Sequence, residues 1–251
     1  MVGFCSGISF DRRLHFKIGA LQIGFLIKKG GRNKDMTISF KKFVSIFWKY
    51  LIHFIKANLM FILFCLPVVT IPSAITGLYA ICTDVVQGKT EGVFQTYKAA
   101  TRKTFLKSIA VTSVFGMLFI AAATGIRFYR VFMGQNMLAI IPEGIALAVG
   151  LVTGAMIPYG YIMLAKTDLK LKDVLKNAFL LVFLEPKGTL LSFFISFFFA
   201  FVMLANFTGF YVIILLIGIS IVAYAGTYFS LYGVQKHVVP KMTEVMNDNI
   251  G

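Results

Sequence analysis

The chain has 251 residues, of which 58% are hydrophobic and only 14% are charged, and its mean hydropathy is +0.83. This composition lies outside that of soluble globular domains, so we expect lipid to be the main solvent of the chain. The apolar runs are long and do not alternate with polar residues, which excludes a transmembrane β-barrel. An all-α polytopic membrane helix bundle is therefore predicted, because helices satisfy their own backbone groups in hydrocarbon.

The chain is strongly basic, with 25 Lys and Arg against 10 Asp and Glu and a formal net charge of +15. Clustered basic residues bind nucleic acid in some proteins. In a helical membrane protein, however, they gather in cytoplasmic loops and face anionic lipid headgroups. We therefore expect the lipid bilayer, and no nucleic acid, as a partner.

The first 35 residues differ from the remainder. They contain seven basic residues and one apolar run, residues 18–27, which is too short to span a membrane and has no signal-peptide cleavage site after it. We interpret residues 1–35 as a non-native or disordered extension and expect translation to start at Met36, with residues 36–251 forming a single membrane domain. The N-terminal mass of the natural protein tests this expectation.

Breaks at Pro, Gly and charged residues divide the remaining chain into six predicted membrane segments: 57–71, 73–87, 108–126, 138–164, 188–206 and 209–232. A spanning helix needs about 20 residues. The first two segments fall short of that length, and this leaves two readings open: a tilted hairpin, or a hairpin that re-enters without crossing.

Either reading returns the chain to the side from which it came, so the basic residues can be assigned to sides. Of the 25 Lys and Arg, only Arg127 and Arg130 fall in a loop assigned to the outside. The positive-inside rule then predicts that both termini and both long loops are cytoplasmic.

Three amphipathic stretches, residues 40–54, 92–106 and 169–184, precede the three predicted hairpins. Each ends at a Lys followed by a small residue, a pattern typical of a helix that lies in the membrane interface before the chain inserts. The recurrence is compatible with an ancestral triplication, but charged boundary residues are generic and favour the simpler explanation.

No enzyme motif is found in the sequence, and the three Cys residues form no metal or redox pattern, so we predict no enzyme, metal or cofactor. Glu143 follows Pro142 at a helix start, where a negative charge suits the helix dipole. Capping is the favoured interpretation, and a proton or cation site is the alternative.

Two further features concern helix packing. The amide of Asn58, near the start of a membrane helix, is expected to need a partner on a neighbouring helix. Ala146, Gly150 and Gly154 recur every four residues and permit close helix approach, either within one chain or in a homo-oligomer.

The stretch from Asn58 to Tyr79, NLMFILFCLPVVTIPSAITGLY, resembles the signature of the YesL family of bacterial membrane proteins. Phe94, Tyr97 and the basic residues 98–107 resemble the cytoplasmic helix that follows in that family. One departure is that Pro72 follows Ile71 directly, where the family pattern has Gly before the Pro. The resemblance implies a bacterial cell membrane location and an accessory role in carbohydrate uptake, with a transporter permease or a sensor histidine kinase as partner.

The residues of this motif predict a tight membrane turn. Pro67 frees a carbonyl, Thr70 can satisfy a local backbone group, and Pro72 begins the next helix at its first position. Two functions stay open: a non-enzymatic accessory protein that binds partners, or a small transporter or channel with a site at the helix break between Pro67 and Pro72, because interrupted helices bind substrates in transporters.

Overall fold

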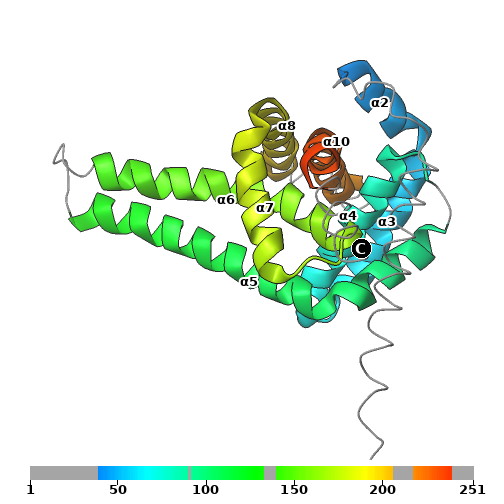
Figure 1. The fold of residues 1–251 in the computed structure, drawn as a ribbon, viewed down its shortest axis with the longest axis horizontal. Helices are drawn as coiled ribbons and strands as arrows, with labels where there is room; N and C mark the ends of the chain where they lie inside the picture. Colours follow the sequence, from blue (N-terminus) through cyan, green and yellow to red (C-terminus); the bar gives the residue numbers. More distant parts are fainter. Residues whose placement is uncertain (1–38, 90–91, 133–139, 206–216, 239–251) are drawn as a thin grey trace, which may run out of the picture. The chain divides into compact units, whose positions relative to one another are not determined.

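A computed structural model describes residues 39–89, 92–132, 140–205 and 217–238. Every regular element in these ranges is helical, so the all-α prediction is confirmed there (Figure 1). The elements are α2 (Phe40–Lys49), α3 (Leu51–Cys65), the 3-10 turn η1 (Val68–Thr70), α4 (Ile71–Val86), α5 (Val93–Phe132), α6 (Ile140–Lys166), α7 (Leu171–Leu184), α8 (Pro186–Ala205) and α10 (Ile219–His237).

Residues Ile38–Val234 form one compact unit. The predicted N-terminal extension, residues 1–35, and part of the last predicted segment, 209–232, lie outside the described ranges.

Three helices in the described ranges are long and apolar enough to cross a membrane, and the number rises to five if each of two bent helix pairs counts as one span. The bent pairs are α2 with α3, at 72°, and α7 with α8, at 100°. The structure thus supports a protein with several membrane helices but not a count of six.

Several predicted boundaries were wrong. Helix α3 ends at Cys65 rather than at residue 71, because Pro67 supplies no N–H to continue it. The predicted amphipathic helix over residues 40–54 is divided at Tyr50, which lies between the end of α2 and the start of α3. The predicted helix over 92–106 is not separate, because it continues into the apolar segment as the 40-residue α5.

Helix α5 is about 60 Å long at 1.5 Å per residue, roughly twice the thickness of the hydrocarbon core. Its uncharged part, residues 108–126 between Lys107 and Arg127, measures about 28 Å, close to that thickness. The basic N-terminal part therefore extends beyond the span without any break in the helix.

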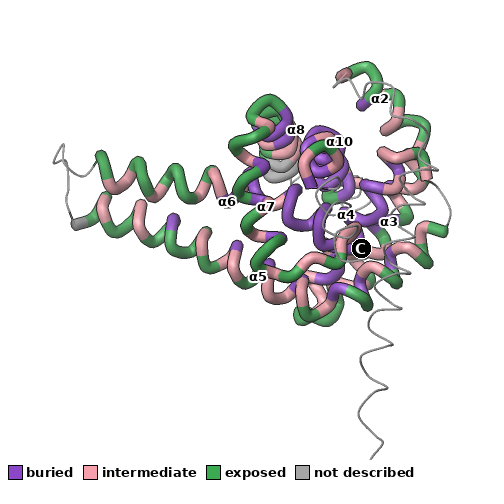
Figure 2. The backbone as a smooth tube through the Cα atoms, viewed as in Figure 1, coloured by how far each residue is buried: buried purple, intermediate pink, exposed green. Residues whose placement is uncertain are grey.

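Helix α4 is the most buried of the early helices (Figure 2). It contacts α3, α5 and α6. Small residues permit this close approach: a Cβ atom on Gly77 would lie 2.6 Å from the Thr101 hydroxyl oxygen and 3.0 Å from the Tyr97 ring of α5. The Tyr97 hydroxyl donates a hydrogen bond of 2.8 Å to the Ala74 carbonyl, which fixes the ring there.

The stripe of Ala146, Gly150 and Gly154 packs within the chain. A Cβ on Gly150 would lie 3.5 Å from the Ala122 methyl group, and the Ala146 methyl group lies 3.2 Å from the Cβ position of Gly125. The stripe thus joins α6 to α5, whose ribbons run side by side in Figure 1. Between the two options left open, the structure places this contact inside one chain.

A second small-residue seam, not identified in the sequence, joins α8 to α10. The Ser192 and Ser196 hydroxyls donate to the carbonyls of Gly226 and Val222, at 3.2 and 3.4 Å. A Cβ on Gly188 would lie 3.0 Å from the Phe229 carbonyl oxygen. Gly188, Ser192 and Ser196 are spaced four residues apart in α8, so they lie on one face of the helix.

Aromatic rings attach α2 to α10. The Phe43 ring stacks on Tyr224 with centroids 4.8 Å apart and on Phe229 at 5.5 Å. The Tyr224 hydroxyl donates to the Phe43 carbonyl at 2.9 Å, so the contact combines apolar burial with a hydrogen bond.

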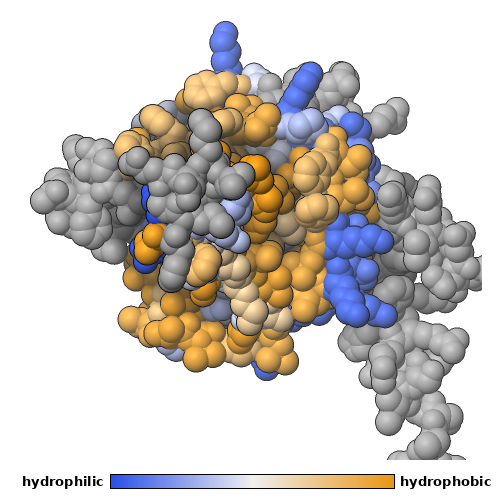
Figure 3. Space-filling view, turned by 90° about the vertical axis from the view of Figure 1, so that its left-hand side faces the viewer, coloured by the Kyte–Doolittle hydropathy of each residue, from blue (hydrophilic) through white to orange (hydrophobic). Residues whose placement is uncertain are grey.

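The outer surface of the described helices is largely apolar. In Figure 3, hydrophobic side chains cover most of the described surface that faces the viewer. On α8, Phe194, Phe197 and Phe198 are each more than 60% exposed. Exposed aromatic residues at this density are unfavourable in water and suit a lipid environment.

We predict that Gly77→Ala lowers the free energy of unfolding by about 1–3 kcal/mol, because the new methyl group has no room between Tyr97 and Thr101. Gly116→Ala, in α5, is the matched control: a Cβ there meets nothing within 4 Å. Thermal unfolding of both variants in one detergent measures the difference. Equal shifts for the two variants would contradict this account of the α4–α5 contact.

Candidate functional site

The predicted turn between α3 and α4 is present. The Thr70 hydroxyl oxygen lies within hydrogen-bond distance of the Phe64 carbonyl and is 2.6 Å from the Pro67 carbonyl, so the expectation that Thr70 satisfies local backbone groups is met. Pro72 is the second residue of α4, which begins at Ile71. The prediction that Pro72 is the first helical residue was therefore wrong by one position.

The side chains at this turn face outward. Leu66 and Val68 are 75% and 76% exposed, and Pro67 is exposed as well. Among the residues that the structure describes, they line no interior surface. Asn58, by contrast, is fully buried in the middle of α3.

Glu143 lies in the first turn of α6, as predicted, and forms an ion pair with Arg130 of α5. The Arg130 Nε atom lies 3.1 Å from a Glu143 carboxylate oxygen. Along α5, Arg130 is about 50 Å from Tyr97, the residue whose ring meets Phe64 beside the turn. The structure therefore separates Glu143 from the other candidate residues.

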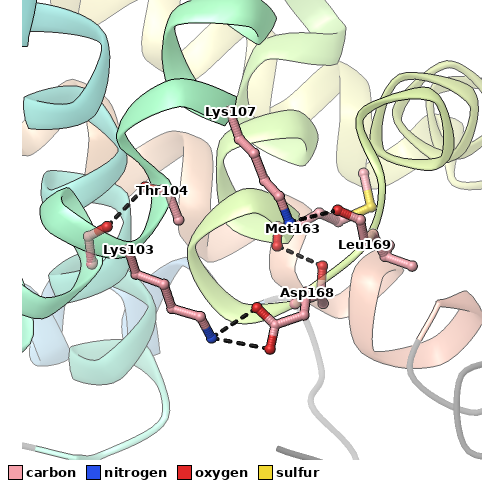
Figure 4. Close-up of polar contacts among 8 residues, drawn as sticks. Lys103, Thr104, Lys107, Met163, Asp168 and Leu169 are labelled. Carbon is pink, nitrogen blue, oxygen red and sulfur yellow. Dashed lines mark hydrogen bonds and ion pairs between the residues drawn. The ribbon is translucent and has the colours of Figure 1, made fainter. Parts of the chain in front are cut away.

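A polar cluster that the sequence did not predict connects α4, α5 and the link between α6 and α7. We call it the basic junction; it consists of Asp84, Lys103, Lys107, Lys166 and Asp168. Lys103 Nζ lies 2.8 Å from an Asp168 carboxylate oxygen, and Lys107 Nζ donates to the Leu169 carbonyl at 3.1 Å (Figure 4). Lys166 Nζ lies 2.6 Å from an Asp84 oxygen.

The two ion pairs of the basic junction differ in burial. Asp84 and Lys166 retain only 17% and 28% of their side-chain exposure, whereas Lys103 and Asp168 retain 66% and 47%. Water screens the attraction between Lys103 and Asp168, so this ion pair contributes little to the stability of the fold. The first pair is held in a drier environment, where loss of one partner would leave a poorly solvated charge.

Lys89 lies close to the partly buried pair of Asp84 and Lys166. Burial lowers the pKa of the Lys89 ammonium, the Asp84 carboxylate opposes this change, and the Lys166 ammonium adds to it. The Lys89 Nζ donates to the Gln87 side-chain oxygen at 3.0 Å. Lysines outnumber carboxylates in this region, so it carries a net positive charge.

One face of α5 is exposed next to the basic junction. Phe94, Lys98, Arg102 and Leu106 recur every four residues and are all exposed; we call them the α5 basic face. Phe94 is 54% and Leu106 78% exposed. The opposite face, which includes Tyr97, is buried against α4.

The sequence contained a weak signal for the basic junction. Asp84 lies three residues before the end of the predicted segment 73–87, and Asp168 lies four residues after the end of the predicted segment 138–164. Their lysine partners come from segments 65 and 82 positions distant, which periodicity along the chain does not reveal.

The basic junction and the α5 basic face together form a positively charged site. Its groups are paired lysines and carboxylates, hydroxyls bound to carbonyls, and exposed cations. The ranges that the structure describes contain no group of three or more His, Cys, Asp or Glu side chains that could hold a metal ion. Such a site attracts anionic groups and holds helices in place.

The chain is thus a helical protein with membrane-spanning character, and one family is similar to part of it. Residues 54–126 match the family described as "Protein of unknown function, DUF624". The match covers α4 completely and most of α3 and α5, including the turn and the α5 basic face. No curated protein and no solved structure matches the chain.

We predict that Asp84→Asn lowers the free energy of unfolding by about 1–3 kcal/mol, because it leaves the partly buried Lys166 without its carboxylate. Asp168→Asn, which breaks the exposed pair, is the control and should cost at most about 1 kcal/mol. Thermal unfolding in detergent measures both. A larger loss for Asp168→Asn would contradict the proposed difference in solvation.

Proposed function

We propose that this protein is a non-enzymatic accessory protein of the membrane, which binds another membrane protein through the α5 basic face. The proposal rests on the exposure and the charge of that face and on its continuity with a membrane segment. The face is exposed, contains no acidic residue, and belongs to the same unbroken helix as an apolar span.

The α5 basic face is held rigidly from behind. Tyr97 bonds to Ala74, and the Thr76 and Ser108 hydroxyls lie 2.7 Å apart. Lys103, at the edge of the face, pairs with Asp168. These contacts hold the backbone of the face in place, so the conformational entropy lost on binding is that of the exposed side chains alone, which favours affinity.

The composition of the face favours a protein partner over a lipid surface. A helix that binds lipid separates its apolar and basic residues onto two faces. Here Lys98 and Arg102 stand between Phe94 and Leu106 on one face. Aromatic residues and Arg are enriched in protein interfaces, and the positive charge selects an acidic surface on the partner.

 The excess of basic residues predicts that α5 begins on the cytoplasmic side, with both termini there. The resemblance of residues 58–79 to the YesL family implies the bacterial cell membrane and a role linked to carbohydrate uptake. We therefore propose a carbohydrate transporter permease or a sensor histidine kinase as the partner.

The exposed turn supports this proposal over a transporter. A substrate site at the break between Pro67 and Pro72 would need polar groups that converge on an enclosed space. Pro67 and Val68 instead face outward, and the Thr70 hydroxyl is already engaged with backbone carbonyls.

We predict that a photoreactive amino acid at Arg102 crosslinks the full-length protein in cells to a sugar permease or a histidine kinase, identified by mass spectrometry. The same amino acid at Lys172, an exposed position on α7, is the control and should not give that product. Lys98→Glu should reduce the crosslink at least tenfold, because it places a like charge opposite the acidic partner.

Two outcomes would refute the proposal. One is recovery of the same proteins from Arg102 and Lys172 at equal yield, which indicates random proximity in the membrane. The other is recovery of lipid adducts alone from Arg102, which assigns the α5 basic face to the bilayer surface.

A further inference from the structure

Helices α3 and α4 form a hairpin that contains no charged residue between Lys56 and Asp84. The two helices have 15 and 16 residues, or about 22 and 24 Å, against a hydrocarbon core of about 30 Å. With the η1 turn included, the second leg extends over Val68–Val86, 19 residues. The first leg reaches a comparable length only by joining α2 across the 72° bend.

Helix α2, which α3 would have to join to reach a spanning length, is unsuited to the hydrocarbon core. Helix α2 contains Lys41, Lys42 and Lys49 and no acidic residue. Charges at the centre of a spanning segment are unfavourable unless they are paired or reach the interface. A hairpin crosses the membrane only if both of its helices span the hydrocarbon core. Because α3 is too short to do so, its length indicates that the hairpin stops inside the bilayer.

The tip of the hairpin is apolar and faces outward. Leu66, Val68 and Val69 are 75%, 76% and 65% exposed. Three large apolar side chains on an exposed turn are unfavourable in water, whereas acyl chains accommodate them.

The backbone of the tip is suited to an environment without water. Pro67 and Pro72 have no N–H group to satisfy. The Thr70 hydroxyl contacts the carbonyls of Phe64 and Pro67, and the Thr70 N–H donates to the Pro67 carbonyl at 2.9 Å. The Ser73 hydroxyl donates to the Thr70 carbonyl at 2.9 Å. Groups that water would otherwise satisfy are thus engaged within the turn, as hydrocarbon requires.

We propose that the α3–α4 hairpin is a re-entrant element whose tip, residues 66–70, contacts the acyl chains inside the bilayer. Lys56 and Asp84, at its two ends, then lie at the same membrane face. This inference goes beyond the proposed function, because it concerns the lipid contact of the chain and requires no protein partner.

Cysteine accessibility tests the position of the tip. Val68→Cys is introduced into the full chain after replacement of Cys5, Cys65 and Cys82, with Val69→Cys as a second probe of the tip. Val131→Cys is the matched control, since Val131 is 77% exposed and lies at the far end of α5. Lys56→Cys reports the face from which the hairpin enters. Each variant is treated with a membrane-impermeant maleimide in inside-out and right-side-out vesicles.

We expect the cysteine at position 68 to resist the maleimide from both sides and to react after detergent is added, with at least a tenfold rise in labelling. The cysteine at position 131 should react from one side and that at position 56 from the other. Labelling at position 68 from the face opposite to position 56 would show a crossing hairpin, and labelling from the same face would show a tip in water. Either result overturns the proposal.

A second measurement uses the natural sequence and does not depend on cysteine replacement. The wild-type protein is reconstituted with a phospholipid that carries a diazirine in the middle of its acyl chain, irradiated and digested. We expect adducts within residues 66–70. Adducts on the exposed phenylalanines of α8 without any on residues 66–70 would overturn the proposal.

The hydroxyl of Thr70 provides a separate prediction. Thr70→Val removes it at nearly constant volume and takes the Thr70 hydroxyl donor from the Phe64 carbonyl in hydrocarbon, whereas the Pro67 carbonyl keeps the Thr70 N–H, so we expect a lower midpoint of thermal unfolding in vesicles. Thr70→Ser keeps the hydroxyl and should retain most of the wild-type midpoint. Equal midpoints for the two variants would show that the Thr70 hydroxyl does not stabilise the turn by hydrogen bonding to its carbonyls.

Discussion

Helix α4 lies against α5 at Gly77, where the Tyr97 ring and the Thr101 hydroxyl occupy the space that a side chain would need. Because this approach is so close, the Tyr97 hydroxyl reaches the Ala74 carbonyl, and the Thr76 and Ser108 hydroxyls meet. One face of α5 is thereby committed to α4, and the residues on its other face are left exposed as the α5 basic face. The position of the hairpin and the exposure of the basic residues thus depend on the same contact.

Hydroxyl groups hold the helices together where the hydrophobic effect does not act. Lipid tails are as apolar as the helix surfaces, so close packing and hydrogen bonds determine which helices associate. The seam between α8 and α10 follows this rule, since Ser192 and Ser196 bond to carbonyls of the facing helix. The small side chains bring the two backbones near enough for these bonds.

Composition and the lack of alternation in the apolar runs together predicted the helical class, because a backbone in lipid is satisfied only in helices or in a closed barrel of alternating strands. Division of the chain at Pro, Gly and charged residues also placed the predicted segments 73–87, 138–164 and 188–206 within two residues of the ends of α4, α6 and α8 in the part of the chain that the structure describes. This division failed at α5, where charged residues predicted a boundary between an interfacial helix and a spanning helix. The helix continues through Lys107 because a lysine does not interrupt a helix. The basic junction could not be predicted, since its ion pairs join segments far apart in the chain.

The unbroken α5 helix also determines how binding at the α5 basic face could affect the membrane region. Lys103 lies at the edge of that face and pairs with Asp168 in the link between α6 and α7. This pair is exposed and weak, so an acidic group on a partner can compete with Asp168 for Lys103 at small cost. Lys107 would still bond to the Leu169 carbonyl, and the partly buried pair of Asp84 and Lys166 would still join α4 to α6. Partner binding would therefore loosen one attachment of the link to α7 while the helices that enter the membrane stay in place.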